Sequence, residues 1–238
     1  MSLLASYPIN EQGRDFAVGD IHGHFSLLKA GLRAIGFDVN RDRLFSVGDL
    51  VDRGPESALA ARWLEQPWFH AIRGNHEDMA CDAATGDGDA TDMHLSNGGE
   101  WLAEMPEADR QSLIGKLLKL PLAMEVATAE GVVGVVHADL PFDDWQAFAK
   151  AVRSGQLSER DRDMCLWSIA RHARGYAQPV AHVRAVVHGH ITVPRMEVLG
   201  NTYFIDTHHS SRPAGQQGHF TFLELGTLQA HEGLGGDW

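Results

Sequence analysis

One pattern occurs three times in the N-terminal third of the chain: a short apolar run, then glycine, then a side chain with an oxygen donor. The three copies end in Asp20, Asp49 and Asn75, which are 29 and 26 residues apart. Such intervals are typical of strand–helix–strand units, in which the apolar runs form neighbouring strands of one sheet. Because open α/β sheets bind ligands beyond the carboxyl ends of their strands, the pattern predicts an α/β fold with its site at that edge.

The segments between these runs have the signals of helices. The apolar spacing predicts a helix with Ser26 as its N-cap that ends at Gly36, and Pro55 suits the first turn of a second helix, which ends before Pro67. Further helices are predicted over about 99–118, 143–152 and 158–173, and further strands over 122–128, 132–137, 185–188, 203–206 and 220–225. No linker separates these elements, so we expect a single domain over residues 1–238.

Residues 82–98 are rich in Asp and Gly, and we predict a solvated surface loop there. A calcium-binding loop is the alternative for so acidic a segment. It is disfavoured because the segment lacks the glycine at position 6 and the glutamate at position 12 that such a loop requires.

Composition narrows the class of protein. The chain has 238 residues and a formal net charge of −12, which disfavours binding to extended nucleic acid. No window approaches the apolar length of a membrane span, and residues 1–13 lack the basic and apolar regions of a secretion signal, so we expect a cytoplasmic protein without a membrane partner. The unusual number is 14 histidines, since histidine together with aspartate is typical of metal or acid–base chemistry.

The predicted strand ends carry side chains that are suited to metal ions. They are Asp20, His22, Asp49, Asn75, His137 and either His188 or His190. Asp20 and His22 are two residues apart, so an extended backbone places them on one face, and the same argument leaves His188 and His190 equivalent. Carboxylate, amide and imidazole donors without a thiolate suit manganese, iron or zinc better than calcium. Six donors fit two divalent ions that share one carboxylate, as in phosphoester hydrolysis.

Groups that a phosphoester requires lie beside these ligands in the sequence. Arg53 and Arg73 can each match two phosphate oxygens with a planar guanidinium. His76 follows a ligand residue and is placed to protonate a leaving oxygen. Either Asp52 or Glu77 could orient its ring.

Three motifs together resemble the signature of the PPP-type metallophosphatases: GDIHGH at 19–24, GDLVDRG at 48–54 and RGNHE at 73–77. Later segments resemble the small bacterial and phage serine/threonine phosphatases within that group, namely HADLP at 137–141, HGH at 188–190 and YFID at 203–206. The similarity extends over residues 16–225. It implies a four-layer α/β/β/α sandwich with mixed sheets and a dinuclear site at the strand ends.

The resemblance also implies a role for each site residue. One metal ion would be held by Asp20, His22 and Asp49, the second by Asn75, His137 and His190, with Asp49 bridging. Arg53 and Arg73 would bind phosphate, and His76, supported by Asp52, would be the general acid. The implied activity is hydrolysis of phosphoserine and phosphothreonine in proteins, and of small phosphoesters, by direct attack of a water or hydroxide between two ions, most often Mn²⁺.

This chain departs from the family pattern where a substrate would approach. Ile169 stands where relatives carry an arginine, so Arg171 or Arg174 would have to supply that charge. His208 and His209 replace the glycine that usually follows the Asp-Thr pair. These departures bear on the identity of the substrate rather than on the type of reaction.

Two other functions fit parts of the sequence. A symmetrical diadenosine tetraphosphate hydrolase has the same N-terminal signature, although the HADLP segment and the chain length favour the protein phosphatase. A catalytically inactive relative that only binds a phosphorylated partner should have lost a ligand, an arginine or the general acid, whereas all of these positions are filled here.

Overall fold

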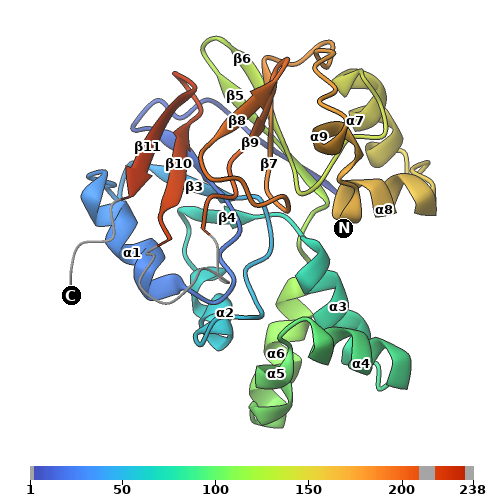
Figure 1. Ribbon diagram of the computed structural model, residues 1–238. Helices are drawn as coiled ribbons and strands as arrows, with labels where there is room; N and C mark the ends of the chain where they lie inside the picture. The colour runs from blue at the N-terminus through green and yellow to red at the C-terminus, as the bar shows by residue number, and fades with distance from the viewer. Residues whose placement is uncertain (1–2, 209–217, 234–238) are drawn as a thin grey trace.

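In the computed structural model, residues 3–208 and 218–233 are described, and they form two β-sheets with helices on the outer faces (Figure 1). The first sheet has the strand order β11-β10-β2-β3-β4. Its strands are β2 (Asp15–Val18), β3 (Arg43–Ser46), β4 (Phe69–Ala71), β10 (Phe220–Glu224) and β11 (Gln229–Gly233). The strands β2, β3 and β4 are parallel, so the threefold pattern of the sequence forms the parallel part of this sheet.

The second sheet has the order β1-β5-β6-β7-β9-β8. Its strands are β1 (Leu4–Tyr7), β5 (Ala123–Thr128), β6 (Gly131–Val136), β7 (Ala185–His188), β8 (Glu197–Leu199) and β9 (Thr202–Phe204). The pairs β1–β5, β6–β7 and β7–β9 are parallel, whereas β5–β6 and β8–β9 are antiparallel. Both sheets are therefore mixed, as the resemblance implies.

The two sheets pack face to face through alternate residues of their strands. Ala17 and Phe45 lie in the apolar cluster between the sheets, together with residues of β6 and β7. Their neighbours Phe16, Val18 and Leu44 point the other way, into the cluster beneath the helices. Because side chains on a strand alternate between its faces, strands that are apolar on both faces require cover on both.

Helices supply that cover. The helices α1 (Phe25–Ala34) and α2 (Ala60–Trp63) pack on the first sheet, while α7 (Trp145–Arg153) and α8 (Glu159–Trp167) pack on the second, followed by the short α9 (Ala170–Ala173). The result is the four-layer α/β/β/α sandwich (Figure 1). Among the described helices, none has both the length and the apolar character to cross a membrane.

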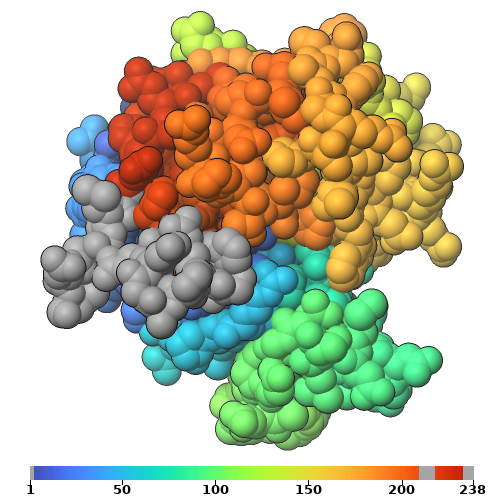
Figure 2. Space-filling model, in the orientation of Figure 1, coloured from blue at the N-terminus to red at the C-terminus, as the bar shows by residue number. Residues whose placement is uncertain are grey.

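Four more helices form a lobe that projects from the sandwich, shown in green in Figure 2. They are α3 (Asn75–Ala83), α4 (Gly88–Ser96), α5 (Glu100–Glu104) and α6 (Glu107–Leu117). The helix α3 begins directly after the third copy of the strand pattern, so the lobe is attached at the functional edge of the first sheet.

The prediction of a surface loop over residues 82–98 is wrong for most of that segment, because α4 lies within it. The carboxylate of Asp87 caps this helix and accepts a hydrogen bond from the backbone N–H of Ala90 at 2.9 Å. His94 anchors the helix from its last turn, and only 2% of His94 is exposed. Polar composition alone predicts a loop here, whereas the cap at Asp87 and the buried side chain of His94 stabilise a helix.

The remaining differences concern the boundaries and continuity of helices and the presence of edge strands. The first helix begins two residues early, after His24, and Ser26 instead donates to the carboxylate of Glu56. The helix predicted over 99–118 is interrupted at Pro106, which cannot donate a backbone hydrogen bond. The strands that were not predicted, β1, β8 and β11, all lie at sheet edges, where one neighbour and a short length leave a weak sequence pattern.

Candidate active site and metal centre

All six side chains that the sequence predicts as metal ligands lie at one edge of the two sheets. They follow β2 (Asp20, His22), β3 (Asp49), β4 (Asn75), β6 (His137) and β7 (His190). Five of them are at most 4% exposed, and His190 is half-buried. Residues more than a hundred positions apart thus meet in one buried polar cluster, which the parallel strands assemble because their carboxyl ends share an edge.

Glycines of the motifs make room for the ligand carboxylates. A Cβ atom on Gly74 would lie 2.1 Å from Oδ1 of Asp49, and a Cβ atom on Gly189 would lie 2.1 Å from Oδ1 of Asp20. Both contacts are far shorter than any real Cβ contact, so the backbone can approach the carboxylates only where a side chain is missing.

The backbone at the site is strained. Positive φ angles between 44° and 70° occur at His22, Asp49, Asp52, Arg53 and His190. Residues other than glycine rarely adopt this conformation, and it persists where the surrounding structure enforces it, often at functional sites. Five of the residues expected in catalysis or metal binding are held in this way.

Three of the predicted ligand atoms meet at Asn75. Its Oδ1 lies 2.8 Å from Nε2 of His137 and 3.1 Å from Nδ1 of His190. The other ring nitrogens donate to carbonyl oxygens, those of Val47 and Trp167. In the neutral rings, the nitrogens that face Asn75 therefore carry lone pairs, as its carbonyl oxygen does. Lone pairs opposed at this distance are stabilised by a shared cation, so these side chains fit a metal ion.

The carboxylate of Asp49 faces both halves of the cluster. Its Oδ1 lies 3.4 Å from Nε2 of His137, and its Oδ2 lies 3.6 Å from Nε2 of His22. Burial acts to raise the pKa of Asp49, but the imidazoles around it, His137 foremost, outweigh this effect and hold the pKa below its usual range. An ionised carboxylate with one oxygen toward each group is suited to bridge two cations.

The other half of the cluster contains Asp20 and His22. Nε2 of His22 lies 3.9 Å from Oδ2 of Asp20, while Nδ1 donates to the carbonyl oxygen of Val51 at 3.0 Å. Nη1 of Arg53 lies 2.7 Å from the same Nε2. Because a guanidinium can only donate, Nε2 of His22 is the acceptor and carries the lone pair that a cation would use.

Burial shifts the pKa of several of these groups in the direction that favours a bound cation. It lowers the pKa of His22 to about 3 and that of His190 to about 4, so both rings are neutral near pH 7 and keep a lone pair for coordination. Burial also raises the pKa of Asp20, as do the negative charges of Asp206 and Asp49. Neighbouring carboxylates that are buried away from water are stabilised by positive charge, which divalent ions would provide.

His76 bonds to Asp52 and not to Glu77, the two partners that its position in the sequence leaves open. Nδ1 of His76 lies 2.7 Å from Oδ2 of Asp52, and its Nε2 faces Oδ2 of Asp49 at 3.8 Å. Burial opposes a charge on this ring, but the carboxylates of Asp49 and Asp52 outweigh it and raise the pKa of His76. Glu77 instead accepts hydrogen bonds from the backbone N–H groups of Asp49, Leu50 and Gly74.

The structure does not bring Arg73 into the cluster with Arg53, contrary to the expectation of two phosphate-binding arginines. The guanidinium of Arg73 donates to Oδ1 of Asp78 at 3.1 Å and to the carbonyl oxygens of Leu117 and Leu118 at 3.3 and 2.6 Å. Those carbonyls lie at the end of α6, where a helix leaves its last acceptors unpaired. Arg73 therefore fastens α3 to the end of α6, a role that the motif alone does not reveal.

Two arginines are the predicted sources of the charge expected at Ile169, which is itself exposed. Arg171 is buried in ion pairs with Asp139 and Asp143. Arg171 and Arg174 both line one cavity of ≈ 220 Å³, so both stay predicted replacements.

The structure separates the two histidines of the HGH segment. His190 reaches Asn75, whereas Nδ1 of His188 donates to the carbonyl oxygen of Val136 at 3.0 Å and its ring stacks on Phe204. His208 packs its ring between those of His24 and Phe220. His209 lies outside the described residues.

Two site residues were missed by the sequence reading. His94 from α4 and Trp101 from α5 both donate to Oδ1 of Asp52, at 2.9 and 2.7 Å. His94 lies in a polar segment outside the three motifs, so the sequence gives no signal that it belongs to the site. Only the docking of the lobe against the GDLVDRG loop brings it to Asp52.

Known proteins share both the sequence pattern and the fold. Residues 16–194 match the model of the calcineurin-like phosphoesterase family. Serine/threonine-protein phosphatase 2 of Escherichia coli is 35% identical over 81% of this chain and 86% of its own length. A symmetrical bis(5′-nucleosyl)-tetraphosphatase of Methylococcus capsulatus is 33% identical, over 60% of this chain and 48% of its own length.

The likeness extends to solved structures. A protein serine/threonine phosphatase of Saccharomyces cerevisiae superposes with a TM-score of 0.65 at 17% identity, covering 94% of this chain and 78% of that one. At such identity the match concerns the fold alone, which is the sandwich described above. The family match over most of the chain, together with a cluster of His and Asp residues that could bind metal ions, shows that this chain is a metallophosphoesterase of the calcineurin-like phosphoesterase family.

Proposed function

We propose that this protein is a manganese-dependent phosphatase that hydrolyses phosphoserine and phosphothreonine in proteins. One observation carries the chemical part of the proposal: Asp49 faces two groups of lone-pair donors, with Arg53 and the His76–Asp52 pair at the same cluster. A dinuclear site needs such a shared carboxylate, and phosphate transfer needs a cation for the phosphate and an acid for the leaving group.

The ligand residues would be Asp20, His22 and Asp49 for one ion and Asp49, Asn75, His137 and His190 for the other. When bound, the two ions lower the pKa of a water molecule and neutralise charge on the phosphoryl group. Manganese suits this mixture of oxygen and nitrogen donors, and iron and zinc are the alternatives.

The protein side chains would carry out the remaining steps. Arg53 binds two phosphate oxygens with its guanidinium, which positions phosphorus beside the cluster. His76 gives the proton on Nε2 to the leaving oxygen of serine or threonine, since its Nδ1–H is engaged by Asp52. Asp52 orients the ring and, together with Asp49, favours its charged form for that transfer.

The choice of a protein substrate depends on the relatives. The Escherichia coli phosphatase aligns over 86% of its length, so nearly all of its chain has a counterpart here. The bis(5′-nucleosyl)-tetraphosphatase aligns over only 48% of its length, so about half of that protein has no matched counterpart in this chain. Hydrolysis of diadenosine tetraphosphate is nevertheless the second candidate, because that relative is 33% identical over 60% of this chain.

One assay tests the proposal. Phosphate release is measured in excess Mn²⁺ from a phosphothreonine peptide and from diadenosine tetraphosphate, with Asp49→Asn as the control for contaminating activity. We expect fast turnover of the peptide and little of the dinucleotide. The reverse order would make the protein a nucleotide hydrolase, and no turnover of either above the Asp49→Asn background would favour an inactive phosphate-binding relative.

A further inference from the structure

The carboxylate of Asp52 is held by three helices of the lobe at once. It is fully buried and accepts hydrogen bonds from His76 on α3, His94 on α4 and Trp101 on α5. His76 uses Oδ2 at 2.7 Å, while His94 and Trp101 share Oδ1 at 2.9 and 2.7 Å. A carboxylate with donors on both oxygens cannot rotate without breaking one of these bonds.

The hydrogen bonds on Asp52 also determine the orientation of the His76 ring. Its Nδ1 binds Oδ2 of Asp52, so the plane of the carboxylate determines where Nε2 points. Nε2 faces the cluster of predicted metal ligands and lies 3.8 Å from Oδ2 of Asp49. With a single donor on Asp52, both the carboxylate and the ring would be free to turn. The two bonds on Oδ1 remove that freedom, in the way that outer hydrogen bonds orient the ligands of metal sites.

We propose that His94 is a positioning residue for the general acid: by holding Oδ1 of Asp52, together with Trp101, it fixes the direction in which Nε2 of His76 delivers its proton. The inference rests on the proposed role of His76 and extends it to a helix outside the three family motifs. His94 does not reach the reacting atoms and acts through Asp52.

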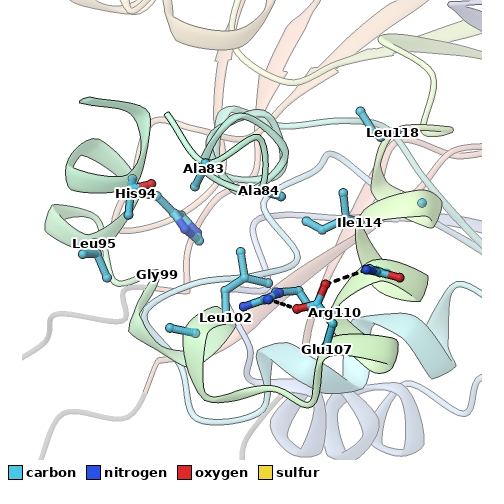
Figure 3. A pocket seen from close by; sticks show the side chains of 15 residues that line it. Ala83, Ala84, His94, Leu95, Gly99, Leu102, Glu107, Arg110, Ile114 and Leu118 are labelled. Atoms are coloured by element: carbon cyan, nitrogen blue, oxygen red, sulfur yellow. Dashed lines mark hydrogen bonds and ion pairs between the residues drawn. The ribbon is translucent and has the colours of Figure 1, made fainter. Parts of the chain in front are cut away.

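The segment after α4 leaves space for the His94 ring and connects it to the GDLVDRG loop. A Cβ atom on Gly99 would lie 2.5 Å from the His94 ring, so the segment after α4 leaves space for the imidazole. The same segment binds the GDLVDRG loop, because the backbone N–H of Arg53 donates to the carbonyl oxygen of Gly98 at 3.2 Å. On its other side, His94 lines a cavity of ≈ 520 Å³ within the lobe, where Figure 3 shows it across from Ile114.

The test compares two esters that differ mainly in their leaving group, phenyl phosphate and p-nitrophenyl phosphate. The poorer leaving group, phenolate, depends more on protonation by a general acid. For His94→Leu we expect kcat on phenyl phosphate to fall roughly tenfold or more, the size typical for loss of an outer-shell partner. On p-nitrophenyl phosphate the fall should be several times smaller, with the content of bound Mn²⁺ unchanged.

Two variants keep the test independent of a general loss of structure. His94→Gln retains an N–H donor that can reach Asp52, so it should recover most of the rate on phenyl phosphate. Gly99→Ala retains the side chains of His94 and Asp52, but its Cβ atom would displace the His94 ring, so it should reproduce the loss of His94→Leu in part. As a matched control, His172→Leu removes another imidazole–carboxylate bond, the one to Glu197, and should change neither rate.

The reference variant is His76→Asn, which should lose rate mainly on phenyl phosphate. If it does not, the role of His76 as general acid fails. If His76→Asn behaves as expected but His94→Leu lowers both rates equally, or lowers neither, the positioning role of His94 is overturned and the proposed function stands.

Discussion

Nη1 of Arg53 lies 2.7 Å from Nε2 of His22, on the lone pair that a metal ion would use. A guanidinium and a cation cannot occupy the same lone pair, so metal binding at His22 must release Arg53. The released side chain remains tied by its backbone to the strained GDLVDRG loop, where φ is 67°. We therefore expect the Arg53 guanidinium to bind phosphate once a metal ion has taken its place on His22.

This relationship predicts the behaviour of Arg53→Gln. Inorganic phosphate should inhibit the variant more weakly by about tenfold to a hundredfold, since a charge-assisted hydrogen bond contributes about 1.5–3 kcal/mol. Affinity for Mn²⁺ should be unchanged or higher, because no guanidinium competes for His22. Inhibition kinetics and calorimetric metal titration measure the two effects, and an unchanged inhibition constant for phosphate would refute the assignment.

The position of Asp49 predicts the metal content of Asp49→Asn. The amide keeps the shape of the side chain but loses the charge and one of the two oxygens that face His22 and His137. We expect fewer than two ions per chain after dialysis against Mn²⁺, measured by mass spectrometry of the metal. Asp15→Asn, which removes a buried carboxylate paired with Arg43, is the control and should retain both ions. Two ions at wild-type affinity in Asp49→Asn would exclude a bridging role.

The location of Arg73 predicts a structural rather than a catalytic effect of Arg73→Gln. Its guanidinium binds Asp78 and the last carbonyls of α6, so the variant should be less stable by about 1–3 kcal/mol. Urea unfolding measures this loss, and the inhibition constant for phosphate should stay near that of the wild type. Arg53→Gln is the matched comparison. Weaker phosphate binding by Arg73→Gln at wild-type stability would contradict this prediction and would indicate that Arg73 binds phosphate.

The burial of His70 predicts a pH effect on stability. Burial foremost, and then the charge of Arg43, lowers the pKa of His70 to about 4 from the value of 6.5 that the unfolded chain regains. Between these values the unfolded state binds more protons, so this contribution to stability is complete above pH 6.5 and is lost as the pH falls toward 4. In His70→Gln the contribution is absent. Urea titrations of the metal-free proteins should give a difference in unfolding free energy that changes over this range, and a constant difference would contradict the prediction.

Much of the fold and most of the ligand set follow from local sequence. The repeated apolar run, glycine and oxygen donor identifies β2, β3 and β4 and the residues at their ends, because strand length and turn chemistry are properties of a few neighbouring residues. The predicted ligands Asp20, His22, Asp49, Asn75 and His137 follow strand-like runs, so the sequence alone identifies them as candidates. Edge strands and α4 could not be predicted so readily, since their stability depends on partners distant in sequence.

What the sequence by itself determined was the kind of chemistry: oxygen and nitrogen donors at strand ends, with arginine and histidine beside them. Only the tertiary structure decided the contacts of Arg73 and His94, which lie against the end of α6 and against Asp52. For the HGH segment, strand spacing leaves His188 and His190 equivalent, the resemblance implies His190, and the structure brings His190 to Asn75. Each of these outcomes depends on the packing of segments that are far apart along the chain, and motif spacing carries no information about such contacts.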